Sequence, residues 1–91
     1  MVRDFDQVRQ DLASTIRKLR AARQLSQEQL ALVADVDRTY VSQIERAISN
    51  PSLMVLCKLG SVLGTDVGSL LDADAQQPAL PRRKRPTPKR P

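Results

Sequence analysis

The sequence predicts an all-α fold, a compact bundle of five helices, followed by a tail without a fold of its own. Between residues 4 and 72, apolar residues recur three and four positions apart, as on the buried face of a helix. No stretch of useful length alternates apolar and polar residues as a strand does. The chain has 91 residues, of which 41% are hydrophobic but only 2% aromatic. One small domain with an aliphatic core therefore fits the composition.

The first helix is expected to begin after Asp4 or Asp6, because either carboxylate can cap its free backbone N–H groups. It should end near Arg23, where basic side chains suit the negative end of the helix dipole. Its buried face is expected to carry Leu12, Ile16 and Leu19.

Two short helices are predicted next, over about residues 26–34 and 37–46. Ser26 and Gln29 have the spacing of a capping box, which marks the start of the first. Asp37 is placed to cap the second. The inner faces of this pair are expected to hold Leu30, Ala31, Ala34, Val41 and Ile44.

A fourth helix is expected to have Pro51 in its first turn and to stop at Gly64, a residue suited to a left-handed end. Its stripe is predicted to consist of Leu53, Leu56, Leu59 and Leu63. Gly60 lies within this helix and predicts a close approach of another helix. Cys57 is expected to be a small core residue. A last short helix should span about residues 66–71.

Several function classes are disfavoured by the composition. The chain has no histidine and one cysteine, so it lacks the commonest general base, a disulfide and the ligands of a Cys/His zinc site. We therefore expect no enzymatic activity, metal or cofactor. No run of about 18 apolar residues is present, so no membrane span is expected. A lone cysteine and the lack of a secretory signal favour the cytoplasm.

Positive charge is concentrated at the C-terminus. The net charge is +5, but residues 1–81 contain nine basic and ten acidic residues, and residues 82–90 contain six basic residues. Residues 73–91 hold five of the six prolines and are predicted to be a disordered tail. This tail is interpreted either as a solvated segment or as a basic arm that contacts DNA or a protein; a nuclear address is disfavoured.

The predicted pair of short helices carries the functional signal. A turn of about four residues joins them, and Ala31 is small where the two helices cross. With Val41 and Ile44 turned inward, the outer face of the second helix is left protruding. A helix held in this way can enter the major groove of DNA, which is about 12 Å wide. The exposed side chains are expected to be Arg38, Thr39, Ser42 and Gln43.

The order and spacing of these residues resemble the Cro/CI-type (Xre) helix-turn-helix family over about residues 12–72. The resemblance is carried by Ile16-Arg17-x-Leu19-Arg20-x-x-Arg23-x-x-Ser26-Gln27-Glu28-x-Leu30-Ala31, by Tyr40-Val41-Ser42-Gln43-Ile44-Glu45-Arg46 and by Asn50-Pro51-Ser52-Leu53. Within the family, residues 38–46 are especially similar to the controller proteins of bacterial restriction–modification systems. The resemblance implies a lambda-repressor-like domain that regulates transcription by binding a palindromic operator as a dimer.

The resemblance also implies residue roles. Base reading is expected from Arg38, Thr39, Ser42 and Gln43, with Arg38 suited to guanine and Gln43 to adenine. Contacts with DNA phosphates are expected from Gln27, Tyr40, Arg46, Ser49 and Asn50. Arg20 and Glu45 are expected to pair as a structural salt bridge. Two residues depart from the family pattern, since Asp35 and Ala47 stand at turn positions that are commonly glycine.

A homodimer is expected because one short helix contacts only a few base pairs. The candidate interface residues are Val67, Leu70 and Leu71, and the competing interpretation is that they close the core of the monomer. A rival function is that of an antitoxin that binds a toxin, through its basic tail, and autoregulates its operon. The resemblance further implies a bacterial or phage source.

Overall fold

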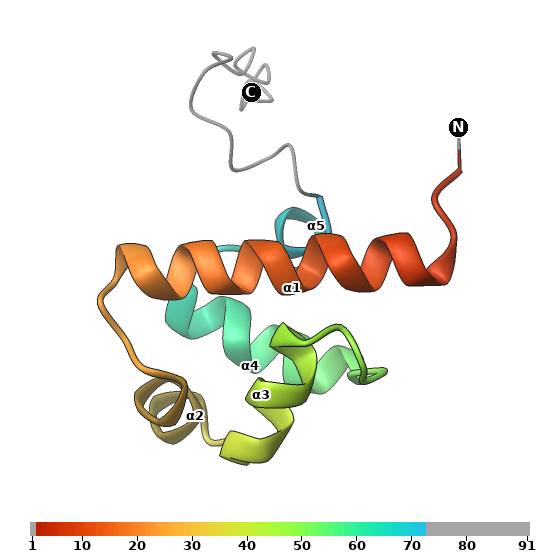
Figure 1. Ribbon diagram of the computed structural model, residues 1–91. Coiled ribbons are helices and arrows are strands. Elements are labelled where there is room, and N and C mark those ends of the chain that lie inside the picture. The colour runs from red at the N-terminus through yellow and green to blue at the C-terminus, as the bar shows by residue number, and fades with distance from the viewer. Residues whose placement is uncertain (1, 73–91) are drawn as a thin grey trace, which may run out of the picture.

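The computed structural model describes residues 2–72 and contains five α-helices in this range. They are α1 (Phe5–Ala22), α2 (Gln27–Ala34), α3 (Arg38–Glu45), α4 (Leu53–Leu63) and α5 (Val67–Leu70). In the view of Figure 1, α2 and α3 lie at the lower end of the molecule, below the long helix α1. The short helix α5 lies at the opposite end, where the described chain also finishes. The predicted all-α bundle of five helices is confirmed for this range.

Helices α1, α2 and α3 begin at the predicted capping residues. The Asp4 carboxylate accepts a hydrogen bond from the backbone N–H of Gln7, at 2.8 Å, so Asp4 and not Asp6 is the cap of α1. Ser26 and Gln29 form the complete capping box at α2. Asp37 caps α3 through the backbone N–H of Thr39. Each cap satisfies a backbone donor that has no partner within its helix.

The prediction for the start of α4 was wrong by about two residues. Pro51 does not lie in the helix, because Ser52 is the capping residue and accepts from the backbone N–H of Val55 at 3.1 Å. At its other end, α4 stops at Gly64, whose φ of 76° is left-handed as predicted. Asp66 then caps α5.

The core is aliphatic and draws on all five helices. It consists of Leu12, Ile16, Leu30, Ala31, Ala34, Val41, Ile44, Leu56, Leu59, Leu63 and Leu70. Two predictions for α4 fail, since Leu53 is 71% exposed and Cys57 is also exposed. At about 100° per residue, Leu53 lies roughly 80° and Cys57 about 120° from the centre of the buried stripe. Apolar character alone therefore did not decide which side of α4 is covered.

Gly60 allows the chain to pass closely over α4. A Cβ atom at this position would lie 2.4 Å from the carbonyl oxygen of Thr65. The predicted close approach is therefore real, but the neighbour is the connection to α5 and not a helix. Leu70 then packs beside Gly60, with its Cδ1 atom 3.5 Å from the same Cβ position.

This packing corrects the expectation for the dimer interface. Leu70 is fully buried in the core of the single chain, so it is not available to a second copy. Val67 and Leu71 are half-buried and pack against the same core. Helix α5 thus closes the monomer, because it covers the apolar surface that α1 and α4 leave open.

None of the helices within residues 2–72 is long and apolar enough to span a membrane. The same part of the chain contains no cluster of three or more potential metal-ligating side chains. The proline-rich basic tail predicted at residues 73–91 lies outside the described residues.

Candidate nucleic-acid interface

A left-handed turn at Asp35 sets the angle between α2 and α3. Asp35 has φ 61° and ψ 48°, and the backbone N–H of Val36 donates to the carbonyl of Ala31 at 2.9 Å. These are the hydrogen bonds of a Schellman stop, in which aspartate takes a position that favours glycine. Lys58 of α4 lies against this turn, with its Nζ 3.4 Å from the Asp35 carbonyl oxygen. The turn is thereby held from within and from α4.

The inner face of α3 is anchored by apolar side chains and one phenol. Val41 and Ile44 are buried in the core, as predicted. The ring of Tyr40 is half-buried against that core. Its hydroxyl oxygen accepts a hydrogen bond from the backbone N–H of Ser52 at 3.2 Å, which ties α3 to the start of α4. The hydroxyl proton remains available for a further acceptor.

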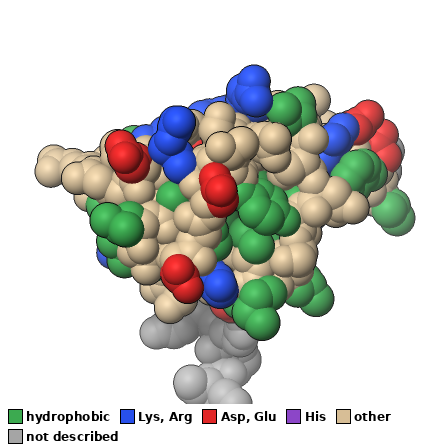
Figure 2. Space-filling view, turned by 90° about the horizontal axis from the view of Figure 1, so that it is seen from below, with side chains coloured by type: hydrophobic (Ala, Val, Ile, Leu, Met, Phe, Trp, Pro, Cys, Tyr) green, Lys and Arg blue, Asp and Glu red, His purple; other side chains and the backbone are tan. Residues whose placement is uncertain are grey.

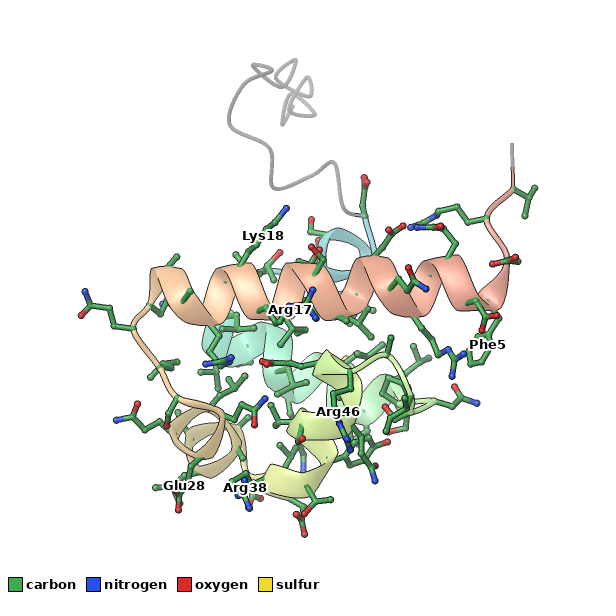
Figure 3. The ribbon with its side chains drawn as sticks, viewed as in Figure 1. Phe5, Arg17, Lys18, Glu28, Arg38 and Arg46 are labelled. Carbon is green, nitrogen blue, oxygen red and sulfur yellow. The ribbon has the colours of Figure 1, made fainter. Side chains whose placement is uncertain are left out.

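The outer face of α3 carries the predicted base-reading residues. Arg38 and Thr39 are exposed, whereas Ser42 and Gln43 are half-buried. Figure 3 shows Arg38 at the lower end of the molecule, remote from α1 and close to α2. Among the described residues, no hydrogen bond or ion pair engages its guanidinium group. Its donors are therefore free for a ligand.

Glu45 is the centre of a polar cluster behind α3. Its carboxylate is buried and accepts from Arg20 twice, Nε to Oε2 at 2.6 Å and Nη2 to Oε1 at 2.9 Å. This bidentate hydrogen bonding raises the pKa of Arg20 above its ordinary value. Arg20 also donates to the Leu25 carbonyl, at 2.9 Å, so one guanidinium joins α1, the loop before α2 and α3. The arrangement is that of the ion pair implied by the family resemblance.

The structure adds Gln27 to this cluster, which the sequence did not indicate. The Gln27 Nε2 atom donates to Glu45 Oε1 at 2.9 Å. One of its amide hydrogens is therefore engaged, and the other, together with the backbone N–H at the start of α2, is left for a phosphate. The orientation of Gln27 is thus fixed by the same carboxylate that holds Arg20.

The chain leaves α3 through a second left-handed residue. Ala47 has φ 59°, and the backbone N–H of Ile48 donates to the Gln43 carbonyl at 3.1 Å. The alanine therefore keeps the turn that glycine commonly makes. Beyond this turn, Asn50 is exposed, as is Arg46 at the helix end. Both can reach a phosphate.

Ser49 does not fit the role expected for it. Its Oγ atom is buried and has no hydrogen-bond partner among the described residues. A phosphate cannot approach a hydroxyl that solvent does not reach. No pattern in the sequence predicts which side chain of this exit loop is turned inward.

The face that contains α2 and α3 is mixed in charge. Figure 2 views the molecule from this end, and Lys and Arg side chains are interspersed there with acidic and hydrophobic ones. This pattern agrees with the near-neutral balance of residues 1–81. DNA affinity cannot arise from a general positive field and must depend on individually placed groups.

Comparisons with known proteins agree with this geometry. The sequence model of the helix-turn-helix family HTH_3 matches residues 16–70. The chain is 39% identical over 67 residues to the control protein C.SmaI of Serratia marcescens, covering 74% of this chain and 80% of that protein. It is 41% identical over 58 residues to the control protein C.BamHI of Bacillus amyloliquefaciens, covering 63% and 72% respectively.

Two solved structures are similar in fold and sequence. The hypothetical transcription factor NHTF from Neisseria superposes with a TM-score of 0.69 at 37% identity, covering 78% of this chain and 82% of that one. The restriction-modification controller protein C.AhdI from Aeromonas hydrophila gives a TM-score of 0.65 at 37% identity, covering 68% and 94%. The family match extends over more than half of the chain and includes every residue of the α2–turn–α3 unit. The protein therefore belongs to the Cro/CI-type helix-turn-helix family of DNA-binding transcriptional regulators.

Proposed function

We propose that the protein binds an operator of two inverted half-sites as a homodimer, with α3 of each copy in the major groove. The observation that carries this proposal is the unpaired guanidinium of Arg38 on a helix that is anchored on its opposite face. An exposed arginine at the start of such a helix can donate two parallel hydrogen bonds to guanine O6 and N7.

The remaining base contacts follow from the outer face of α3. Gln43 is half-buried, so its amide has fewer orientations than that of a solvated glutamine, and it is suited to pair with adenine N6 and N7. Thr39 and Ser42 offer a hydroxyl or a methyl group to base edges. Phosphate contacts are assigned to Gln27, Tyr40, Arg46 and Asn50. The dimer supplies affinity that a single α3 lacks.

Similar proteins support a narrower role. C.SmaI and C.BamHI are named control proteins, and C.AhdI is named a restriction-modification controller protein. By analogy, this protein is proposed to control the transcription of restriction–modification genes. It would do so in the cytoplasm and without a catalytic step. A transcriptional reporter driven by the promoter that lies nearest its own gene would test the assignment: expression should change when the protein is supplied. An unchanged reporter would contradict it.

Selection of bound sequences from random DNA tests the operator directly. The expected result is two inverted half-sites with centres about one helical turn, or 34 Å, apart. Enrichment of a single asymmetric site would contradict the dimer, and the absence of any enrichment would contradict sequence-specific binding. The selected half-site also reveals whether guanine and adenine occupy the positions expected for Arg38 and Gln43.

The surface proposed for the second copy lies where apolar side chains are exposed next to the end of α3. Ile48, Leu53 and Met54 are 56%, 71% and 65% exposed and belong to the α3–α4 connection and the first turn of α4. Light scattering of Leu53→Asp tests the assignment, with Leu32→Asp as the matched control, because Leu32 is an exposed leucine on α2. The mass should fall to that of a monomer only in Leu53→Asp. Equal masses in the two variants would place the interface elsewhere.

A further inference from the structure

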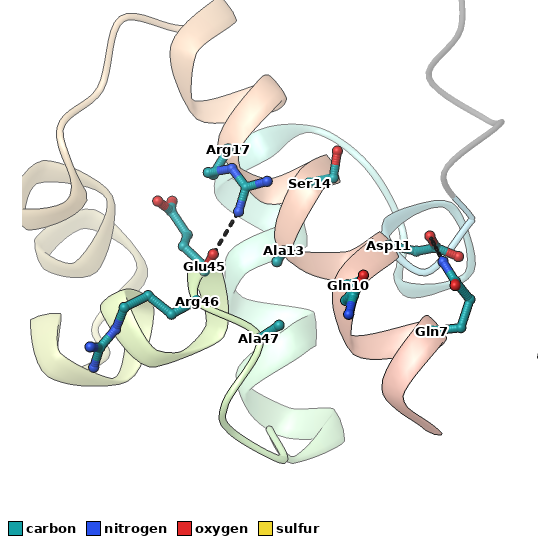
Figure 4. Close-up of a pocket in the computed structure, with 9 residues that line it drawn as sticks. All are labelled: Gln7, Gln10, Asp11, Ala13, Ser14, Arg17, Glu45, Arg46 and Ala47. Atoms are coloured by element: carbon teal, nitrogen blue, oxygen red, sulfur yellow. Dashed lines mark hydrogen bonds between the residues drawn. The ribbon is translucent and has the colours of Figure 1, made fainter. Parts of the chain in front are cut away.

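A groove of about 690 Å³ lies between α1 and the C-terminal end of α3. Its walls include Gln10, Ser14 and Arg17 from α1, and Arg46 and Ala47 from the end of α3. Figure 4 shows Arg17 on the α1 wall and Arg46 at the end of α3, with the Arg46 guanidinium extending away from Arg17. The expected phosphate contacts include Arg46 alone of this set. The α1 residues of the groove are not among the expected DNA contacts.

The arginines of the groove are not neutralised by carboxylates. Arg17 donates from Nη1 to the backbone carbonyl of Glu45 at 2.6 Å, and no ion pair within residues 2–72 engages either Arg17 or Arg46. The Glu45 carboxylate is bound by Arg20 and Gln27, and it points away from the groove (Figure 4).

The carboxylate at one end of the groove, that of Asp11, is already paired with neighbouring side chains. Asp11 accepts from Arg3, Nη1 to Oδ2 at 2.5 Å, and from Gln7, Nε2 to Oδ1 at 2.9 Å. Because Arg3 balances its charge, Asp11 does not cancel Arg17. The groove therefore has an excess of positive charge.

One hydrogen bond orients Arg17 but engages only one of its N–H donors. A guanidinium has five N–H donors, and Arg17 is exposed, so donors remain directed to solvent. Its planar fork fits a phosphate better than a point charge does. Ser14 lies three residues earlier on α1, within the spacing of one helix face, and adds a hydroxyl donor. The chemistry of this group of residues is that of an anion site.

We propose that Arg17, supported by Ser14, binds a phosphate of the DNA backbone that borders the major groove read by α3, at a groove of the protein whose other wall carries Arg46. A helix in the major groove has a phosphate backbone along each side, and a cavity beside the end of that helix lies over one of them. This inference rests on the proposed DNA binding. In this proposal α1 contributes part of the affinity for DNA. The domain is near neutral, so its overall charge cannot supply that affinity.

The test compares Arg17→Gln with Lys18→Gln. Glutamine keeps a donor for the Glu45 carbonyl but removes the charge. Lys18 is the next residue and has the same charge, but Figure 3 shows it on the side of α1 that is turned away from α2 and α3. Affinity is measured for the selected operator and for a random duplex over a range of salt concentrations.

Arg17→Gln is expected to reduce the slope of log affinity against log salt by about 0.9 per half-site, or about 1.8 for an operator bound by a dimer. The loss should be similar for operator and random DNA, since a phosphate contact does not read sequence. Lys18→Gln should leave the slope close to that of the wild type. An unchanged slope in Arg17→Gln, or equal changes in both variants, would overturn the proposal.

A second measurement separates a lost contact from a weakened fold. Single methylphosphonate substitutions, which neutralise one phosphate, are placed in turn along the operator. At one position per half-site, the substitution should weaken the wild type but not Arg17→Gln. The same set of losses in both proteins would contradict the proposal even if the variant were less stable. If the wild type bound no duplex at all, the proposed function itself would fail, which is a different outcome.

Discussion

The two faces of α3 are built for opposite purposes. On one face Val41, Ile44 and Glu45 are 0%, 2% and 5% exposed, and on the other Arg38 and Thr39 are open to solvent. An eight-residue helix is too short to be stable alone, so its conformation depends on the buried face. The side chains of the exposed face are not needed to hold the helix and are available for DNA contacts. Stability and recognition should therefore respond separately to substitution.

The buried face also contains a charge, which makes it more sensitive than an apolar face. Glu45 accepts from Arg20 and Gln27 where water does not compete. Removing one partner of a buried pair leaves the other uncompensated. A single carboxylate therefore joins α3 to both α1 and α2.

The largest expected effect is that of Glu45→Gln. The substituted amide keeps the shape but gives Arg20 one acceptor in place of two, and it presents an N–H group where an acceptor is needed. The free energy of unfolding should fall by about 3 kcal/mol, at the low end for a broken buried pair because Arg20 is partly exposed. Urea unfolding measures the loss. A stability equal to that of Arg38→Ala would erase the distinction between the two faces.

Arg38→Ala should act on binding and leave stability unchanged. Affinity for the operator is expected to fall by about 1–3 kcal/mol, with a smaller loss on random DNA and a relaxed preference at one base position. Arg38→Lys is the matched variant, since it keeps the charge but cannot form the bidentate contact. If Arg38→Lys bound the operator as the wild type does, the charge and not base reading would explain the role of this residue.

A smaller effect is expected at Ala47, where the chain leaves the C-terminal end of α3. Ala47 is left-handed, a conformation that costs an L-residue about 1–2 kcal/mol, whereas glycine loses more chain entropy on folding. Ala47→Gly should therefore stabilise the fold by about 0.5–1 kcal/mol, measured by thermal unfolding. Ala21→Gly, in an exposed turn of α1, should instead destabilise it by about 1 kcal/mol. Destabilisation by both would show that the exit turn is not strained.

The smallest effect concerns Asp11, which lies away from both faces of α3. The hydrogen bond from Arg3, and then that from Gln7, lower the pKa of Asp11 below its ordinary value. A carboxyl with a lowered pKa in the folded state stabilises the fold above its unfolded pKa of about 3.9, and this contribution is lost as the pH falls through the folded pKa. Asp11→Asn should thus be slightly less stable than the wild type at pH 7. The difference should disappear in strong acid, and a constant difference would exclude the linkage.

Interactions between residues close in sequence were predictable. The caps at Asp4, Ser26 and Asp37 lie within three residues of the N–H groups they accept from, so the sequence contains both partners in one window. The same holds for the left-handed turn at Asp35. The α2–α3 unit and its exposed face could be recognised for this reason.

Contacts between distant segments were not predictable in the same way. Leu53 has the spacing of a stripe residue but lies beyond the edge that its neighbours cover, and the sequence leaves open whether Leu70 lies at an interface or completes the core, as it does in the structure. The burial of the Ser49 hydroxyl also depends on how the exit loop returns to the domain. Each of these outcomes is set by which helix lies opposite, and that information is not local.

The sequence by itself determined the helices, the capping residues of α2 and α3, the family and the exposed face of α3, because helical periodicity and capping act within a few residues. Only the tertiary structure decided that Gln27 joins Arg20 on the Glu45 carboxylate, that α5 closes the monomer, and that Arg17 and Arg46 line one groove. These arrangements bring together residues that are far apart in the sequence, and their energy depends on burial and distance, which exist only once the chain has folded.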